Sequence, residues 1–350
     1  MEEKKKSVKR GSMKPGKLDI RFMEGLLGEF ASSDRRVVLG PKIGEDAAVV
    51  DPGRSRKRYW VVTADPITFT PEDIGYYGVV VNMNDIATRG AIPRWFLVTL
   101  LFPEEGTDRR TVEKVFRQIQ RACRQFNISL IGGHTEVTSG VERLILSGNM
   151  IGEVQKRKLV TTGGARTGDL LLLVKGVCIE GTSIIAREKR SDLVRRGIAP
   201  GLVRRAKNYL FNPGIEVLHA ARMACDSASV HSMHDPTEGG LINGIIEMAI
   251  ASRKEIEVDL GRVPIYRESR ILCEAYGLNP LGVIASGALL LTISPSDLPA
   301  VGRVFGRAAV PVQVIGQVKK GPMARVLTVE GKRRKELEPL RRDEILKIFE

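Results

Sequence analysis

The stretch from Gly44 to Pro93 reads GEDAAVVDPGRSRKRYWVVTADPITFTPEDIGYYGVVVNMNDIATRGAIP and carries three aspartates at near-equal spacing. Asp46 precedes a short apolar run, Asp65 follows a β-rich run, and Asp85 lies within an apolar helical pattern. Buried carboxylates are costly unless they are paired or bind a cation. Hard oxygen ligands of this kind suit Mg²⁺ beside substrate phosphates. The stretch therefore predicts a magnesium–phosphate site between strands and a helix. The alternative is that all three acids cap turns or helices.

Apolar patterns on either side of this stretch alternate between the periods of a strand and of a helix. Strands are expected at 59–64, 94–102, 128–131 and 143–154, and helices at 18–30, 71–88 and 108–126. After a turn at 161–165, the second half again mixes strands with helices. We therefore expect a mobile basic arm over 1–17, an N-terminal domain over 18–160, a C-terminal domain over 161–330 and a charged tail over 331–350 that forms a peripheral helix.

The charge, the apolar runs and the cysteines indicate which partners, compartment and cysteine chemistry to expect. The formal net charge of +14 would attract polyphosphates or nucleic acid, or would simply form a solvated surface. No nucleic-acid module accompanies the charge and aromatic residues are only 5% of the chain, so a nucleic-acid partner is not expected. No apolar run could span a membrane and no signal peptide is evident, which favours a cytoplasmic protein. The isolated cysteines 123, 178, 225 and 273 are expected to be buried, without a disulfide or a zinc site.

A glycine-rich segment, GGHTEVTSG, follows the strand expected at 128–131. The backbone N–H groups of Gly132 and Gly133 and the hydroxyl of Thr135 are candidates to hold phosphate oxygens. His134 is a candidate acid–base because imidazole titrates near neutral pH, and Glu136 is a candidate to bind a cation or to orient water. The alternative is a plain turn.

A second motif, HDPTEGGL at 234–241, is expected to lead into a helix. Asp235 is a candidate catalytic residue, and Asp235 or Thr237 is also a candidate helix cap. The first N–H groups of that helix, with Gly239 and Gly240, would then face a ligand anion. The alternative is an ordinary capped helix start. A metal site at His231 and His234 is not expected, because the sequence offers no third ligand beside them.

Together these motifs resemble the superfamily of ATP-binding enzymes related to aminoimidazole ribonucleotide synthetase (PurM). Its members include selenophosphate synthetase, thiamine-monophosphate kinase and the hydrogenase maturation factor HypE. The resemblance runs from about residue 15 to residue 318 and is strongest to HypE-like proteins. The residues that carry it are GEDAAVV at 44–50, the pattern around Asp65, VNMNDIATRGAIP at 81–93, GGHTEVT at 132–138 and HDPTEGGL at 234–241.

The resemblance implies an α+β, two-domain PurM-like fold, with an N-terminal mixed sheet that dimerises into a barrel and a C-terminal α/β domain. It also implies a homodimer that binds ATP and Mg²⁺ in a cleft at the dimer interface. In this chain, Asp46, Asp65 and Asp85 match the metal–phosphate acids, and Asn84 and the Gly132–Glu136 loop match nucleotide contacts. Lys17 belongs to an arm that folds over the phosphates in relatives.

Some positions depart from the HypE pattern. HypE carries its reactive thiol on a C-terminal cysteine, whereas the last cysteine here is Cys273, so we expect that chemistry not to run in the same way. His134 stands where several relatives have Asp, and Glu238 where HypE has Arg. The resemblance thus implies an ATP- and Mg²⁺-dependent enzyme that uses the γ-phosphate to activate an oxygen of an unknown small-molecule or protein acceptor. Lys17 and Arg89 are candidates to offset phosphate charge.

Two alternatives to this function remain. One is a small-molecule kinase like thiamine-monophosphate kinase. The other is a nucleotide-binding partner in a maturation complex that does not turn over.

Overall fold

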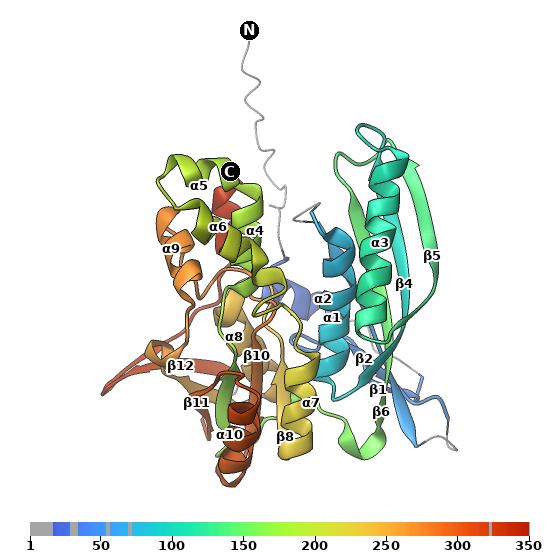
Figure 1. Ribbon diagram of the computed structural model, residues 1–350. Helices are drawn as coiled ribbons and strands as arrows, with labels where there is room; N and C mark the ends of the chain where they lie inside the picture. Colours follow the sequence, from blue (N-terminus) through green and yellow to red (C-terminus); the bar gives the residue numbers. More distant parts are fainter. Residues whose placement is uncertain (1–16, 29–33, 54–56, 69–71, 322–323, 350) are drawn as a thin grey trace.

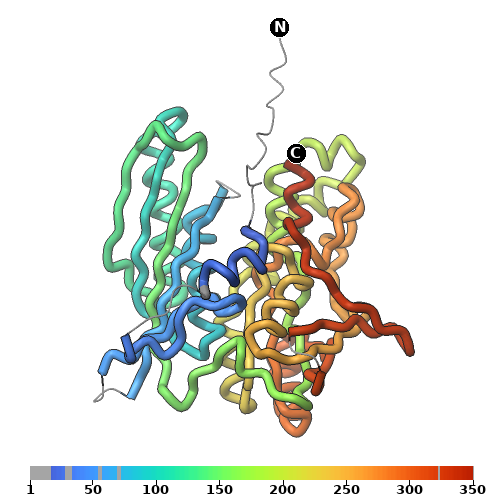
Figure 2. Tube along the Cα trace, turned by 180° about the vertical axis from the view of Figure 1, so that it is seen from behind, coloured from blue at the N-terminus to red at the C-terminus, as the bar shows by residue number. Residues whose placement is uncertain are grey.

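The computed structural model describes residues 17–28, 34–53, 57–68, 72–321 and 324–349. They form two α+β lobes side by side, and the chain crosses from the first lobe to the second near residue 160 (Figure 1). The expected two-domain α+β architecture is confirmed. Of the basic arm expected over 1–17, only Lys17 lies within the described residues. Seen from behind, residues 17–28 lie between the two lobes (Figure 2).

The N-terminal lobe is built on a six-stranded sheet in the order β1-β2-β3-β6-β4-β5. Only β4 and β5 pair in parallel; the other neighbours are antiparallel. Helices α2 and α3 cover one face (Figure 1). The elements are α1 (Ile20–Gly28), β1 (Val37–Leu39), β2 (Ala48–Val50), β3 (Arg58–Ile67), α2 (Ile74–Thr88), β4 (Ile92–Pro103), α3 (Arg109–Gln125), β5 (Ser129–Thr138) and β6 (Ile145–Gln155).

Helix α2 is the element on which both lobes pack, and all 15 of its residues are buried. One side contacts β3 and β6, and the other contacts α7 and β8 of the second lobe. The sequence is apolar around the whole helix circumference, as expected of a helix enclosed on all sides. The polar side chains on α2 are therefore enclosed, either within the first lobe or in the joint between the lobes.

Among the described residues, nothing covers the second face of the first sheet or pairs with the free edge of β5. Residues of β4 alternate between buried and half-buried, as expected for a sheet packed on one face only. The edge strand β5 is exposed along nearly its whole length. Gly132–Glu136, expected as a loop, is instead the middle of β5, because the edge of β4 offers pairing partners as far as Pro103.

The C-terminal lobe is a seven-stranded sheet in the order β13-β12-β9-β11-β7-β10-β8, with layers on both faces. Along β7, Leu171 and Leu173 pack toward α8, and Leu172 and Val174 toward the other face. The elements are β7 (Leu170–Val174), α4 (Ile179–Glu188), α5 (Arg190–Arg195), α6 (Pro200–Lys207), α7 (Leu218–Ser227), β8 (Val230–His234), α8 (Gly240–Ser252), β9 (Glu255–Val258), α9 (Arg267–Ala275), β10 (Leu289–Ile293), α10 (Leu298–Arg307), β11 (Val312–Lys319), β12 (Arg325–Glu330) and β13 (Arg333–Glu336).

The tail differs from the peripheral helix that its charge pattern favoured. It forms strand β13, which pairs with β12, and then a 3₁₀ turn at Glu344–Ile348. Ile345, Leu346 and Ile348 are buried against the C-terminal lobe. The prediction of a helix was wrong because the basic residues of β13 face solvent in a hairpin, while the apolar residues of the tail supply the packing.

Ion pairs join the lobes around the N-terminal end of α2. Arg187 on α4 lies 3.0 Å from Asp73, its side chain is 1% exposed, and Lys207 pairs with Glu72. Three of the four cysteines are buried as expected, and Cys225 is half-buried. Within the described residues, no helix is both long enough and apolar enough to cross a bilayer.

Gly133 should prove essential for the pairing of β5 with β4. Its φ is +144°, and a Cβ atom there would lie 1.9 Å from the carbonyl oxygen of Val98, whereas at Gly132 the nearest atom would be 3.9 Å away. We expect Gly133→Ala to lower the free energy of unfolding by about 2 kcal/mol or more, and Gly132→Ala by about 1 kcal/mol or less. Urea denaturation of the two variants checks this. Equal losses of unfolding free energy in the two variants would contradict the special role of Gly133 in strand pairing.

Candidate functional site

The three aspartates expected to act together do converge, on the face of the first sheet that α2 covers. Asp65 lies on β3, Asp85 on α2, and Asp46 in the loop before β2. The hydroxyl of Thr63 lies 2.6 Å from Oδ2 of Asp85 and 3.0 Å from the carbonyl oxygen of Asp46. The N–H of Asp65 donates to the side chain of Asn82 at 3.0 Å. Strand β3 and helix α2 therefore hold the aspartates as one cluster.

The second lobe adds two residues from the end of β8. His234 lies between two carboxylates, with Nδ1 2.9 Å from Asp46 and Nε2 2.8 Å from Glu247. Asp235 is 1% exposed, and neither of its carboxylate oxygens has a hydrogen-bond partner among the described residues. Asp46, His234 and Asp235 each offer a ligand atom, and these atoms lie within 4.8 Å of one another. The candidate site is thus shared by both lobes.

The electrostatics of the cluster favour a bound cation. Burial, and then the charges of Asp65, Asp235 and Asp46, raise the pKa of Asp85 well above its usual range. Burial, and then the charge of Asp46, raise the pKa of Asp235 to about 8. Carboxylates this close cannot all ionise without a compensating charge. A divalent cation with oxygen ligands supplies such a charge, and the unpartnered oxygens of Asp235 fit that role.

Asp46 behaves differently from its neighbours because cations surround it. Burial opposes its ionisation, but the charge and hydrogen bond of His234, with the charges of Arg89 and Lys17, lower the pKa of Asp46 to about 2. The two flanking carboxylates likewise outweigh burial and raise the pKa of His234 to about 10. His234 is therefore an imidazolium at neutral pH, held as an internal cation between Asp46 and Glu247.

Arg89 lies behind the cluster and does not reach toward a ligand. Its side chain is fully buried; it pairs with Glu45, lies 3.5 Å from Asp46, and donates to Thr162 at 2.9 Å. Glu45 also accepts hydrogen bonds from the N–H groups of Thr162 and Gly163. The expectation that Arg89 offsets phosphate charge is not supported by this position. Arg89 instead fixes the acidic loop against the segment between the lobes.

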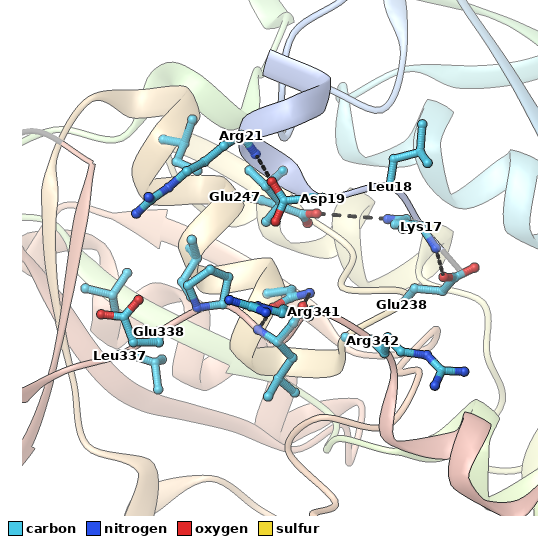
Figure 3. Close-up of a pocket in the computed structure, with 18 of the residues that line it drawn as sticks. Lys17, Leu18, Asp19, Arg21, Glu238, Glu247, Leu337, Glu338, Arg341 and Arg342 are labelled. Carbon is cyan, nitrogen blue, oxygen red and sulfur yellow. Dashed lines mark hydrogen bonds and ion pairs between the residues drawn. The ribbon is translucent and has the colours of Figure 1, made fainter. Parts of the chain in front are cut away.

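Lys17 lies at the boundary between the cluster and a cavity of about 580 Å³. Its Nζ lies 3.0 Å from the Thr237 hydroxyl and 4.0 Å from Glu247, and its backbone N–H donates to Glu238 at 2.9 Å. Figure 3 shows Lys17, Glu238 and Glu247 directed toward one another at this corner of the cavity. Half of the Lys17 side chain is exposed, and its ammonium group lies between a hydroxyl and a carboxylate.

The candidates on β5 are not brought to the cluster within one chain. In the sheet register, Asp65 pairs with Gly148, Gly148 with Val98, and Val98 with Gly133. Gly133 therefore lies three strand spacings from Asp65, which is roughly 14 Å. His134 and Glu136 alternate with Gly133 and therefore lie on the opposite face of the sheet from Asp65. They lie 3.1 Å apart and are both exposed. The roles of Gly132, Gly133, His134, Thr135 and Glu136 remain predictions.

Asn84 is fully buried and bonded across the joint between the lobes. Its amide nitrogen donates to the carbonyl of Ile215 at 2.8 Å, and its amide oxygen accepts the N–H of Val217 at 2.9 Å. These two bonds give Asn84 a structural role, and its expected nucleotide contact stays a prediction. Sequence reasoning missed His234, Glu45 and Glu247; the placement of His234 directly before Asp235 was the available signal.

Replacing Asp235 should stabilise the protein in the absence of cations. The pKa of Asp235 is raised in the folded state above its unfolded value, so the folded protein holds a proton that the unfolded chain has lost. Stability therefore falls as pH rises from about 4 to about 8. We expect Asp235→Asn to remove this slope and to gain ~1 kcal/mol or more at pH 8. Denaturation with EDTA at pH 5 and pH 8 measures it.

Asp226→Asn, at an exposed position, is the control and should leave the pH dependence of wild type unchanged. Parallel curves for wild type and Asp235→Asn would contradict the raised pKa.

Comparison with known proteins places this arrangement in a family. Two family descriptions match the chain: "AIR synthase related protein, N-terminal domain" over residues 44–154, and "AIR synthase related protein, C-terminal domain" over residues 166–328. A putative hydrogenase expression/formation protein of Methanocaldococcus jannaschii is 28% identical over 67% of this chain and 66% of its own length. Carbamoyl dehydratase HypE of Rhizobium leguminosarum is 26% identical, over 67% and 65%. The chain thus spans slightly less than two thirds of these two relatives.

A thiamine-monophosphate kinase of Pyrococcus horikoshii is 26% identical over 80% of this chain and 84% of its own length. The fold is shared with solved structures at lower identity. The thiamine-monophosphate kinase structure described as AaThiL with AMPPCP and TMP aligns at a TM-score of 0.67, over 91% of this chain and 95% of that one, at 20% identity. HypE in complex with ATP aligns at 0.64, over 95% and 94%, at 22% identity. With both lobes matched, the chain belongs to the AIR synthase related proteins.

Proposed function

We propose that this protein is an ATP- and Mg²⁺-dependent enzyme that uses the γ-phosphate to activate an oxygen atom of an acceptor. The observation that carries the proposal is the buried, unpartnered carboxylate of Asp235, which faces Asp46 across the joint between the lobes. A permanently buried and unpaired acid is unfavourable in the ligand-free protein. Such a group is expected where binding of a cation repays its cost.

Each residue of the cluster has a distinct task in this proposal. Asp46, Asp65, Asp85 and Asp235 would hold Mg²⁺, which when bound neutralises phosphate charge and aligns the γ-phosphate for transfer. His234 keeps the Asp46 carboxylate in place through the hydrogen bond to Nδ1. The ammonium group of Lys17, already beside Thr237, would meet the phosphate on its open side. Positioning and charge neutralisation are the main sources of rate in phosphoryl transfer.

The cavity next to Lys17 supports a small-molecule acceptor. Its volume of about 580 Å³ lies in the range of small-molecule sites. An acceptor held there would reach the phosphate from the side of Lys17. Among the relatives, one acts on thiamine monophosphate and another is a carbamoyl dehydratase. A small-molecule kinase is therefore the second candidate, and a phosphorylated acceptor rather than free phosphate would favour it.

We also propose a homodimer that completes the site. Of twelve large apolar side chains exposed among the described residues, nine lie between Leu18 and Val137 in the N-terminal lobe. Leu130, Ile131 and Val137 belong to the exposed edge strand β5. Exposed apolar side chains along an unpaired strand edge favour contact with another chain. Pairing of two such sheets would cover this surface, and the cleft for ATP and Mg²⁺ would lie between the two subunits.

Mg·ATP should bind and stabilise the fold. A ligand that binds only the folded state adds about 2.7 kcal/mol to the free energy of unfolding at a hundredfold excess over its dissociation constant.

Asp85→Asn should weaken the binding of Mg·ATP, while the melting temperature without ligand holds or rises because repulsion between the acids falls. Calorimetric titration and thermal melts measure both. An unmoved melting temperature in saturating Mg·ATP would refute the proposal.

Light scattering should give a mass near twice the 38.5 kDa of one chain. The double variant Ile131→Lys/Val137→Lys should dissociate the dimer, because it places charges in the apolar strand edge. Val194→Lys, on an exposed apolar residue of the other lobe, is the matched control and should remain dimeric. A wild-type mass near 38.5 kDa would contradict the homodimer.

A further inference from the structure

The segment that follows β13 runs across the N-terminal end of α8 and forms one wall of the cavity. Leu337, Glu338 and Leu340 line the cavity opposite Lys17. The segment is fastened to α8 by Asn243, whose Oδ1 accepts the N–H of Leu340 at 2.8 Å and whose Nδ2 donates to the carbonyl of Leu340 at 3.1 Å. This part of the chain is therefore fixed beside the candidate site.

Asp343 forms a second link, by hydrogen bonding to the loop that carries Asp235. The Asp343 side chain is buried; its Oδ2 accepts the N–H of Gly239 at 2.7 Å and its Oδ1 accepts the N–H of Ile345 at 2.8 Å. Gly239 is the N-cap of α8, and no side chain of the loop itself caps this helix. The position that the sequence assigned to a ligand anion is thus occupied, at Gly239, by a carboxylate of the same chain.

The loop between Asp235 and α8 is held from two sides. On the side of the acidic cluster, Thr237 and Glu238 bind Lys17 at 3.0 Å and 2.9 Å. On the far side, only one residue away, Gly239 binds Asp343. Gly239 and Gly240 both have positive φ, at 80° and 62°, and so lie in the left-handed region that glycine adopts most readily. Besides these contacts, the carbonyl oxygen of Thr237 accepts the N–H groups of Gly240 and Ala285 at 3.0 Å and 3.3 Å.

We propose that Asp343 is a positioning residue for nucleotide binding, which acts through Gly239 and does not touch the nucleotide. Its carboxylate holds the loop so that Thr237 and Glu238 receive Lys17 and so that Asp235 faces Asp46. This inference rests on the proposed function, since it assigns a task in binding Mg·ATP. Nucleotide binding would then depend on a residue that lies more than a hundred positions from the loop in the sequence.

The test compares four variants with wild type. Asp343→Ala removes the acceptor of Gly239, and Asn243→Ala releases Leu340, so each loosens the loop by a different route. Asp343→Asn keeps one acceptor oxygen. Leu193→Ala, in the buried part of α5, destabilises the C-terminal lobe without contacting the loop. For each protein, the Kd of the non-hydrolysable complex Mg·AMPPCP is measured by calorimetry, and hydrogen exchange is followed in the peptide 235–243.

Asp343→Ala removes the acceptors of both Gly239 and Ile345. Loss of the bond to Gly239 predicts that this variant weakens Mg·AMPPCP binding about tenfold and speeds exchange in the peptide. Asn243→Ala should act in the same direction. Asp343→Asn keeps one acceptor oxygen for two N–H donors, so its Kd should lie between those of wild type and Asp343→Ala. Leu193→Ala should melt earlier with an unchanged Kd.

Wild-type affinity and wild-type exchange in Asp343→Ala would overturn the inference. So would a loss of affinity that follows the melting temperature across all four variants, because that pattern denotes general destabilisation. Failure of wild type itself to bind Mg·AMPPCP would instead overturn the proposed function.

Discussion

The buried guanidinium of Arg89 is the constraint on which the rest of the site depends. Arg89 follows the last residue of α2, where a cation also meets the negative end of the helix dipole. A buried arginine is tolerated only if anions surround it, and Glu45 and Asp46 provide them. Because Glu45 also holds Thr162 and Gly163, one charge fixes the acidic loop, helix α2 and the segment between the lobes together. Loss of Glu45 would leave the buried charge of Arg89 without its nearest anion.

Hydrogen bonds connect Thr162, which binds Arg89, to strand β8 of the second lobe. The hydroxyl of Thr162 donates to the carbonyl of Met233, and the hydroxyl of Ser232 donates to the carbonyl of Thr162. These bonds set the position of β8 and hence of His234 and Asp235, which follow directly. The distance between Asp46 and Asp235 is therefore decided by the packing of two lobes and not by either lobe alone.

The aspartates of the site differ in how their charge is compensated. Asp46 is neutralised within the protein by His234 and Arg89, and its pKa is low. Burial and neighbouring carboxylates raise the pKa of Asp85 and of Asp235, and at Asp235 they outweigh the charges of His234 and Arg89. Structural charges are usually paired, whereas functional ones are often left in strained environments. This division distinguishes Asp46, which the protein itself neutralises, from Asp85 and Asp235, whose ionisation would depend on a bound cation.

The sequence by itself indicated the longer elements of the first lobe, namely strands β3, β4 and β6 and helices α1, α2 and α3. It also grouped Asp46, Asp65 and Asp85 in one predicted site and indicated the family. Those features follow from local period and from motifs whose residues lie close together along the chain. Only the tertiary structure decided that Gly132–Glu136 is an exposed strand, that the charged tail packs by its apolar residues, and that His234 is an internal cation. His234 finds Asp46 across 188 positions, and Gly239 finds Asp343 across 104. Local periodicity reports on neighbours within a few residues, so contacts of this kind leave no pattern that a single sequence can reveal.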